Sequence, residues 1–149
     1  MLTFREMTAD DHNLVLPMVE AFYATDAVEH PVPRTVMERT FAAAVDPAET
    51  GLRGVLMLED SAPAGYIYLT TCYSCEVGGT CVILEELFLW DQYQGKGYGK
   101  RALDWIMEQY PQCRRLRLEV TQVNQRAVHL YEKCGFTYLR YDQMVLDRP

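Results

Sequence analysis

Residues 94–101, QGKGYGKR, place a glycine at every second position directly before an apolar helical pattern. Glycines so spaced leave backbone N–H groups uncovered by side chains. A glycine turn at a helix N-terminus directs several free N–H groups and the positive end of the helix dipole at one spot. Three cations of the segment, Lys96, Lys100 and Arg101, add positive charge. The segment therefore predicts a phosphate or pyrophosphate site, with a tight strand–helix connection as the alternative.

Two familiar nucleotide motifs fit these glycines poorly. A dinucleotide fingerprint requires a third glycine where Lys100 stands. Its relaxed form can use Ala102, but only Glu119 lies near the distance at which an acid would hold the ribose. A P-loop requires glycine where Gln94 stands and serine or threonine where Arg101 stands.

Two sequence blocks together resemble one enzyme family. Gln94–Gly99, behind EELFLWDQY, resembles the acetyl-CoA pyrophosphate loop of the GNAT N-acetyltransferase superfamily, and Asn124–Phe136 resembles its N-x-x-A-x-x-L-Y-x-x-x-G-F signature. The blocks are separated by one predicted helix and one predicted strand and lie within residues 85–136. The resemblance implies an acetyl-CoA-dependent N-acetyltransferase that acts by direct attack of a primary amine. The length of the chain predicts one domain over residues 1–149.

The resemblance also implies a path for acetyl-CoA, the expected cosubstrate. The pyrophosphate would lie on the N–H groups of residues 95–100, and the pantetheine arm would pair with the backbone of Leu87 and Leu89. The thioester would enter a gap between that strand and the strand containing RLEV. The residues expected to contact acetyl-CoA are Leu87, Phe88, Leu89, Gln94, Gly95, Lys96, Gly97, Tyr98, Gly99, Lys100, Asn124, Ala127, Tyr131 and Lys133. Asn124 is equally suited to cap a helix.

The catalytic candidates are one phenol and a set of carboxylates. The resemblance implies that Tyr131 protonates the leaving thiolate, although Tyr131 also falls on the apolar stripe of its helix. For the base, the candidates are Glu85, Glu86 and Glu119; similar family members have an acid at the spacing of Glu85, which is favoured here. Strand alternation places Glu85 and Glu86 on opposite faces, so only one is expected at the cleft. These carboxylates could instead bind a cationic substrate.

The charge distribution favours a cationic substrate. Residues 1–60 contain eleven acids and four arginines, and therefore contribute all of the formal net charge of −7. This disfavours nucleic acid as a partner and favours a small polycationic amine or a lysine or peptide amine. The loops around residues 24–34 and 72–80 are expected to select the amine. An acyl-CoA-binding sensor or scaffold without turnover is the alternative function, and because family members often form dimers, a homodimer is the alternative to a monomer.

Composition argues against other classes of protein. No apolar run approaches the ~20 residues of a membrane span, and the first residues lack a signal-peptide pattern. We therefore expect a cytoplasmic protein without a membrane partner. Five cysteines without a framework spacing suit a reducing compartment. The CxxC at Cys72 and Cys75 has no second ligand pair, so neither a metal site nor redox chemistry is expected.

The periodicity predicts a mixed α/β domain. The expected order is β-α-α-β-β-β-α-β-α-β-β. The resemblance implies a GNAT-like, mostly antiparallel sheet of about six or seven strands flanked by about four helices. One helix is expected to begin near Thr35, another to follow the glycine segment up to Pro111, and a third to end at Gly135. FTYLRY and QMVLD, residues 136–141 and 143–147, are predicted as the closing strands.

Overall fold

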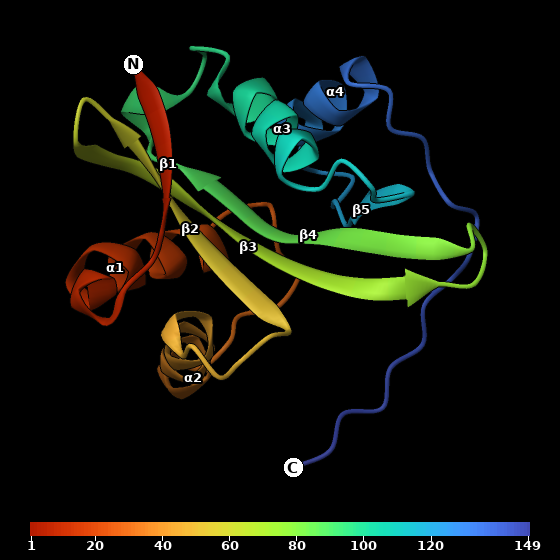
Figure 1. Cartoon of the computed structure of the whole chain (residues 1–149), viewed down its shortest axis with the longest axis horizontal. Coiled ribbons are helices and arrows are strands. Elements are labelled where there is room, and N and C mark those ends of the chain that lie inside the picture. Colours follow the sequence, from red (N-terminus) through yellow and green to blue (C-terminus); the bar gives the residue numbers. More distant parts are fainter.

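The computed structural model, which describes residues 1–149, has a five-stranded mixed sheet with two helices on each face (Figure 1). In chain order the elements are β1 (Leu2–Glu6), η1 (Ala9–Asp11), α1 (His12–Tyr23), α2 (Arg34–Val45), β2 (Leu52–Glu59), β3 (Ala62–Ser74), β4 (Gly79–Leu89), η2 (Asp91–Tyr93), α3 (Tyr98–Gln109), β5 (Arg115–Leu118) and α4 (Gln125–Lys133). The helices are at most 12 residues long, and none is long and apolar enough to cross a membrane.

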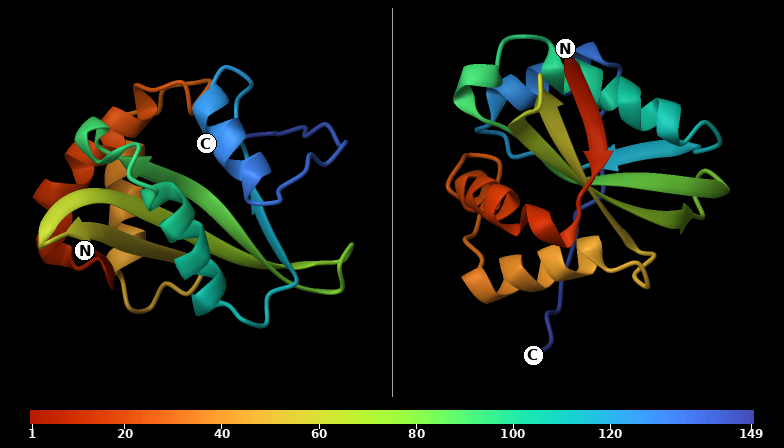
Figure 2. Two further views of the ribbon diagram at one scale, coloured as in Figure 1. Left: turned by 90° about the horizontal axis from the view of Figure 1, so that it is seen from above. Right: turned by 60° about the vertical axis from the view of Figure 1, so that its left-hand side comes forward.

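The strands lie in the sheet in their sequence order, β1 to β5. The first four pair antiparallel, and β5 pairs parallel to β4 after the crossover through α3. The helices α1 and α2 cover one face of the sheet, and α3 and α4 cover the other (Figure 2). Alternate residues of the strands therefore enter two cores: Tyr66 and Tyr68 face Phe22 of α1, whereas Ile67 and Leu69 pack in the cluster of α3 residues such as Ile106.

This order confirms the predicted α/β architecture up to the end of α4, but the two closing strands are wrong. Residues 137–149 form no strand, and none of their backbone groups takes part in a backbone hydrogen bond. The alternating pattern indicates a segment able to form a strand, but a strand also needs a partner edge. In this structure the segment leaves α4 at Gly135, runs past β5 and extends away from the body of the molecule (Figure 1).

A carboxylate close to the start of α1 stabilises the junction with β1. Asp11, 4% exposed, accepts hydrogen bonds from both terminal nitrogens of Arg5, each at 2.8 Å, and from the Thr8 backbone N–H at 2.7 Å. The Arg5 guanidinium, with help from Thr8, lowers the pKa of Asp11 to about 2. The ionised carboxyl therefore stabilises the folded state at neutral pH.

Replacing this carboxylate by its amide, Asp11→Asn, is expected to lower the free energy of unfolding by about 2 kcal/mol at neutral pH, roughly 4–8 °C in melting temperature. Since the folded-state pKa is below the unfolded one, the difference from wild type is complete above about pH 4 and disappears as the pH falls toward 2. Thermal unfolding across this pH range measures it. Asp10→Asn, at an exposed neighbour, is the control and should change little; equal melting curves for Asp11→Asn and wild type at neutral pH would contradict the assignment.

Candidate active site

The glycine segment forms a loop with unoccupied donors before α3. None of the backbone N–H groups of residues 95–100 donates a hydrogen bond to any acceptor of the chain; the first that does is Arg101 N–H, to the Gly97 carbonyl. Gly95 and Gly97 have φ of +76° and +80°, a conformation that side chains disfavour. These turns and the N-terminus of α3 produce the predicted anion cradle.

The cation that lies at this loop without an acidic partner is Arg126, which the sequence motifs did not indicate. Lys96 pairs with Glu59 at 2.9 Å, Lys100 with Asp104 at 2.7 Å and Arg101 with Glu108 at 3.6 Å, so each of the three predicted cations has an acidic partner. Arg126, at the start of α4, instead donates to the Gln94 side-chain oxygen at 2.6 Å. Its other terminal nitrogen lies 3.6 Å from where a Cβ on Gly95 would be. No pattern around Arg126 reveals this, because its position depends on how α3 and α4 pack.

Gly99 explains why α3 and α4 can pack so closely. A Cβ on Gly99 would lie 2.7 Å from the Leu130 Cδ2 atom, closer than real contacts allow. Gly99 therefore lets the first turn of α3 approach α4 closely. This contact fixes α4, and with it Asn124 and Tyr131, relative to the loop. Asn124 is the N-cap of α4, where its side-chain oxygen accepts from the Ala127 N–H at 3.3 Å.

The predicted gap between β4 and β5 is present. The pairing of the two strands ends at Leu84 and Leu118, so residues 85–89 of β4 have no partner on that side. Trp90 N–H donates to Ala64 of β3, and the backbone of Leu89 consequently points the other way, into the gap. The Gln94 side chain donates to the Leu89 carbonyl at 3.1 Å, which ties the glycine loop to this strand. The gap thus presents the free N–H group of Leu89 and, by strand alternation, the backbone groups of Leu87.

A bulge in β4 changes which side chains reach the cleft. Tyr68 and Leu69 of β3 face Glu86 and Leu84, which leaves Glu85 without a partner. As a result Glu85 and Glu86 both line one cavity, and the prediction that only one of them lies at the cleft is wrong. Strict alternation fails because the bulge is a property of the pairing with β3, which the sequence of β4 alone does not reveal.

Glu86 is held at the floor of this cavity by two phenols. Tyr23 of α1 donates to one carboxylate oxygen at 2.7 Å, and Tyr66 of β3 donates to the other at 2.6 Å. Burial raises the pKa of Glu86, and the two hydrogen bonds offset only part of that rise. Glu85 is exposed and accepts from the Thr70 hydroxyl at 2.8 Å. The two neighbouring carboxylates therefore differ in solvation and in partners.

The cavity lies where β4 and β5 separate and has a volume of about 490 Å³. Four carboxylates line it, and neither lysine nor arginine does; the four are Glu29, Glu85, Glu86 and Glu119. The connection between α1 and α2, through residues 27–30, forms one wall, and the Thr121 hydroxyl donates to the Asp26 carbonyl beside it. The hairpin 72–80, which was expected to take part in selection, lines no part of this cavity.

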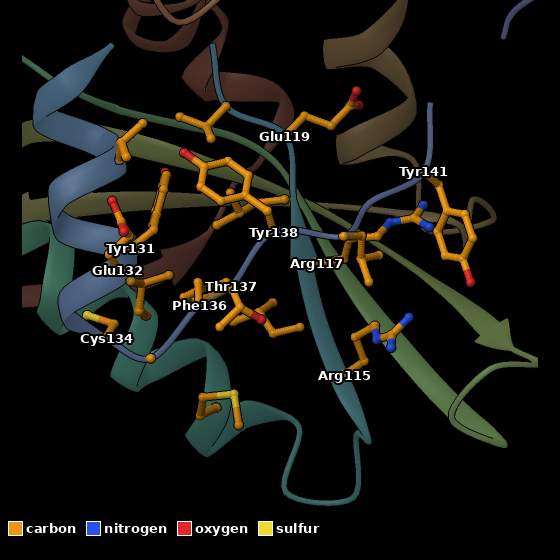
Figure 3. A pocket seen from close by; sticks show the side chains of 18 of the residues that line it. Arg115, Arg117, Glu119, Tyr131, Glu132, Cys134, Phe136, Thr137, Tyr138 and Tyr141 are labelled. Carbon is orange, nitrogen blue, oxygen red and sulfur yellow. The ribbon is translucent and has the colours of Figure 1, made fainter. Parts of the chain in front are cut away.

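Tyr131 of α4 lies between this cavity and a groove along β5 (Figure 3). Its ring packs against Phe136 with centroids 5.6 Å apart, and its hydroxyl has no hydrogen-bond partner within the chain. Burial raises the pKa of Tyr131 to about 12, so the phenol holds its proton at neutral pH. Two residues expected to contact acetyl-CoA do not line this cavity: Phe88 is buried in the core against α1, and Lys133 is exposed at the end of α4.

Comparison with known proteins agrees with this geometry. Residues 17–136 match the model of the Acetyltransferase (GNAT) family. The chain is 33% identical over 90 residues, 55% of its length and 56% of the relative's, to the uncharacterised N-acetyltransferase YbbJ of Bacillus subtilis (strain 168). It is 33% identical over 60 residues, 38% of this chain and 40% of the relative, to the spermine/spermidine N(1)-acetyltransferase of the same strain. The chain thus spans about half or less of the curated relatives it matches.

The fold has solved counterparts as well. A crystal structure described as a possible acetyltransferase from Clostridium difficile 630 superposes with a TM-score of 0.82 over 100% of this chain and 99% of that chain, at 16% identity. At such low identity the likeness shows the fold alone. The family match covers most of the chain, and the protein therefore belongs to the Acetyltransferase (GNAT) family.

Proposed function

We propose that this protein transfers an acetyl group from acetyl-CoA to a primary amine of a small polycation. The observation that carries the proposal is that a carboxylate-lined cavity, a strand gap and a loop of free N–H donors follow one another along β4 and the loop after it. An amine on a lysine side chain or a peptide is the broader form of the same proposal. The GNAT family membership supplies the reaction class, and the spermine/spermidine acetyltransferase relative is consistent with the substrate class.

Residues 95–100 and Arg126 would hold the pyrophosphate. The free N–H groups supply the hydrogen bonds, and Arg126 supplies a charge that no acid of the chain compensates. Leu87 and Leu89 would pair with the amides of the pantetheine arm, as an added strand would. Acetyl-CoA bound in this way supplies an activated thioester at the inner end of the gap, beside Glu86 and Tyr131.

The proposed proton acceptor, Glu86, and the proposed proton donor, Tyr131, line the same cavity. We propose Glu86, rather than the exposed Glu85, as the group that accepts the proton of the incoming ammonium, directly or through water. Its raised pKa brings it closer to the neutral pH at which a general base works best. Tyr131, which keeps its proton at neutral pH, is positioned to protonate the leaving thiolate.

Selection of the amine follows from charge. The four carboxylates of the cavity attract a substrate with more than one positive charge and repel one with a carboxylate of its own. Glu85, exposed at the bulge, would bind a second ammonium, as would Glu29 and Glu119. A diamine or polyamine is therefore expected to react better than a monoamine of equal length.

Thermal unfolding with and without acetyl-CoA tests the cosubstrate site. Ligand at a hundred times its Kd is expected to add about 2.7 kcal/mol, roughly 5–10 °C, whereas NAD and ATP should add much less. Arg126→Gln is expected to weaken acetyl-CoA binding about tenfold, since it removes one charge-assisted contact. The matched control is Arg39→Gln, which removes the same charge from the exposed side of α2 and should leave binding unchanged. Equal shifts with all three ligands, or none with acetyl-CoA, would contradict the site.

A further inference from the structure

The β3–β4 hairpin contains three of the five cysteines of the chain: Cys72 on β3, Cys75 in the turn and Cys81 on β4. All three are free thiols. The end of this hairpin extends beyond α1 and α2 (Figure 1). Cys72 and Cys75 are exposed there, whereas Cys81 is 1% exposed. None of the three lines the carboxylate-lined cavity, so the proposed acetyl transfer provides no role for them.

Two of these thiols lie directly opposite each other on neighbouring strands. The antiparallel register of β3 and β4 pairs Cys72 with Cys81. Opposed residues of such a pair project their side chains from the same face of the sheet, and their Cα atoms lie about 4.5–5.5 Å apart. A disulfide joins Cα atoms that are about 4.4–6.8 Å apart. The two thiols can therefore be joined without a movement of the backbone.

Neighbouring cysteines do not meet this requirement. Cys75 follows Cys72 by three residues, and at a rise of about 3.3 Å per residue along a strand their Cα atoms are about 10 Å apart, beyond the limit of about 7 Å for a disulfide. Cys113 packs against the core cluster that contains Val82, whose side chain leaves β4 on the face opposite to that of Cys81. The C-x-x-C spacing in the sequence consequently does not identify the pair that can form.

The surroundings of the two thiols give them different reactivities. Burial, and after it the neighbouring Cys72, raises the pKa of the Cys81 thiol, and Arg117 and Arg115 of β5 offset only part of this rise. Cys81 therefore keeps its proton at neutral pH and is shielded from reagents in solution. Cys72 is exposed and can meet such a reagent. The exposed thiol is thus placed to react first and the buried thiol to react second.

We propose that Cys72 and Cys81 form a thiol modification site, which a small-molecule disulfide converts into an intramolecular disulfide. The Cys72 thiolate attacks one sulfur of the reagent, forms a mixed disulfide and releases one thiolate. The Cys81 sulfur, whose proton passes to the departing group, then attacks the Cys72 sulfur and expels the second thiol. Overall, two protein thiols are oxidised and one reagent disulfide is reduced to two thiols.

The crosslink would restrain the part of the sheet that precedes the active-site bulge. Cys81 is the first residue of β4 in the pairing with β5, so the crosslink connects three neighbouring strands. Two residues before Cys72 on β3, the Thr70 hydroxyl donates to Glu85 at the bulge, at 2.8 Å. Oxidation therefore reduces the freedom of the hairpin segment that supports Glu85 on one side.

Peptide mapping of the full chain tests the pairing. The reduced protein is freed of reductant, incubated with oxidised glutathione and then alkylated. Cleavage after Tyr73 and Glu76 separates the three cysteines of the hairpin from one another. We expect a peptide in which Cys72 is linked to Cys81, lighter by two hydrogens than the sum of its parts. The other exposed thiols, which have no partner opposite them, are expected to give at most a mixed disulfide with glutathione.

Three variants separate the roles of the thiols. Cys81→Ala should lose the linked peptide and stop at a mixed disulfide with glutathione on Cys72. Cys72→Ala, at an exposed position where the core is unchanged, should lose the linked peptide and leave Cys81 unreacted. The matched control, Cys75→Ala, removes the other thiol of the C-x-x-C spacing and should form the linked peptide as fast as wild type. Thermal unfolding checks that each variant is folded.

Four results in the wild-type protein would overturn the proposal. They are a link between Cys72 and Cys75, a link between two chains, a mixed disulfide that persists on Cys72, and a Cys72 that does not react at all. All are read from masses of peptides and do not depend on acetyl transfer. The modification site is therefore tested independently of the proposed activity.

Discussion

Tyr131→Phe is expected to lower kcat about a hundredfold, at the lower end of what a general acid contributes, while acetyl-CoA affinity stays the same. The change removes one hydroxyl whose only role in the proposed reaction is to protonate the thiolate. Because that hydroxyl has no hydrogen-bond partner in the chain, its loss should not lower the melting temperature. Steady-state kinetics together with an acetyl-CoA titration measure both quantities.

Tyr138→Phe is the matched control for this variant. Tyr138 lines the groove along β5 together with Tyr131 (Figure 3) and is 46% exposed, so its hydroxyl is a second phenol at the same groove. The control should keep full turnover. If Tyr138→Phe lost activity and Tyr131→Phe kept it, the proton donor would be assigned to the wrong tyrosine.

Glu86→Gln is expected to lower kcat about a hundredfold at neutral pH, whereas Glu85→Gln should raise the KM for a polyamine about fivefold and leave kcat nearly unchanged. The amide is isosteric and relieves the burial of a charge, so the fold should tolerate it. The contrast between the two variants follows from their environments. Glu86 is half-buried between two phenols and is proposed to act on the reacting nitrogen, whereas Glu85 is exposed and is proposed to bind a distant ammonium. The opposite pattern would return the role of base to Glu85.

The pH dependence of kcat/KM provides a second readout for the same carboxylate. A base is active when deprotonated, so the rate falls as the pH drops through the pKa of Glu86. Tyr23→Phe removes one donor that favours the carboxylate form, and the pKa of Glu86 then rises further. The acidic limb should therefore move to higher pH in this variant. If the acidic limb stayed at the same pH in Tyr23→Phe, it would not report the titration of Glu86.

The sequence predicts the order of elements well because each is encoded locally. The start of α2 lies within a residue of its expected position, and the helix after the glycine segment begins at Tyr98 and ends before Pro111, as the pattern indicates. The closing strands fail for a different reason. The apolar and aromatic residues of 136–147 indicate the ability to form a strand, but whether the segment pairs with a sheet edge depends on where the whole segment runs.

In the candidate site, too, some features are set by the local sequence and others depend on how distant elements pack. The glycine motif predicts the cradle of free N–H groups, since the glycines themselves set the backbone. The orientation of Glu85 and the position of Arg126 could not be read in the same way. The first depends on a bulge in the pairing of β4 with β3, and the second on the close approach of α3 and α4 at Gly99.

The most direct test of the central claim is amine-dependent release of the CoA thiol, followed by mass spectrometry of the amine. With acetyl-CoA and spermidine or spermine, we expect thiol release in step with a singly acetylated product. We also expect a higher kcat/KM than for a monoamine of similar length, and a loss of both signals in Tyr131→Phe and Glu86→Gln. Acetyl-CoA binding without thiol release for any primary amine would contradict the proposed activity, and the protein would then be an acyl-CoA-binding module without turnover.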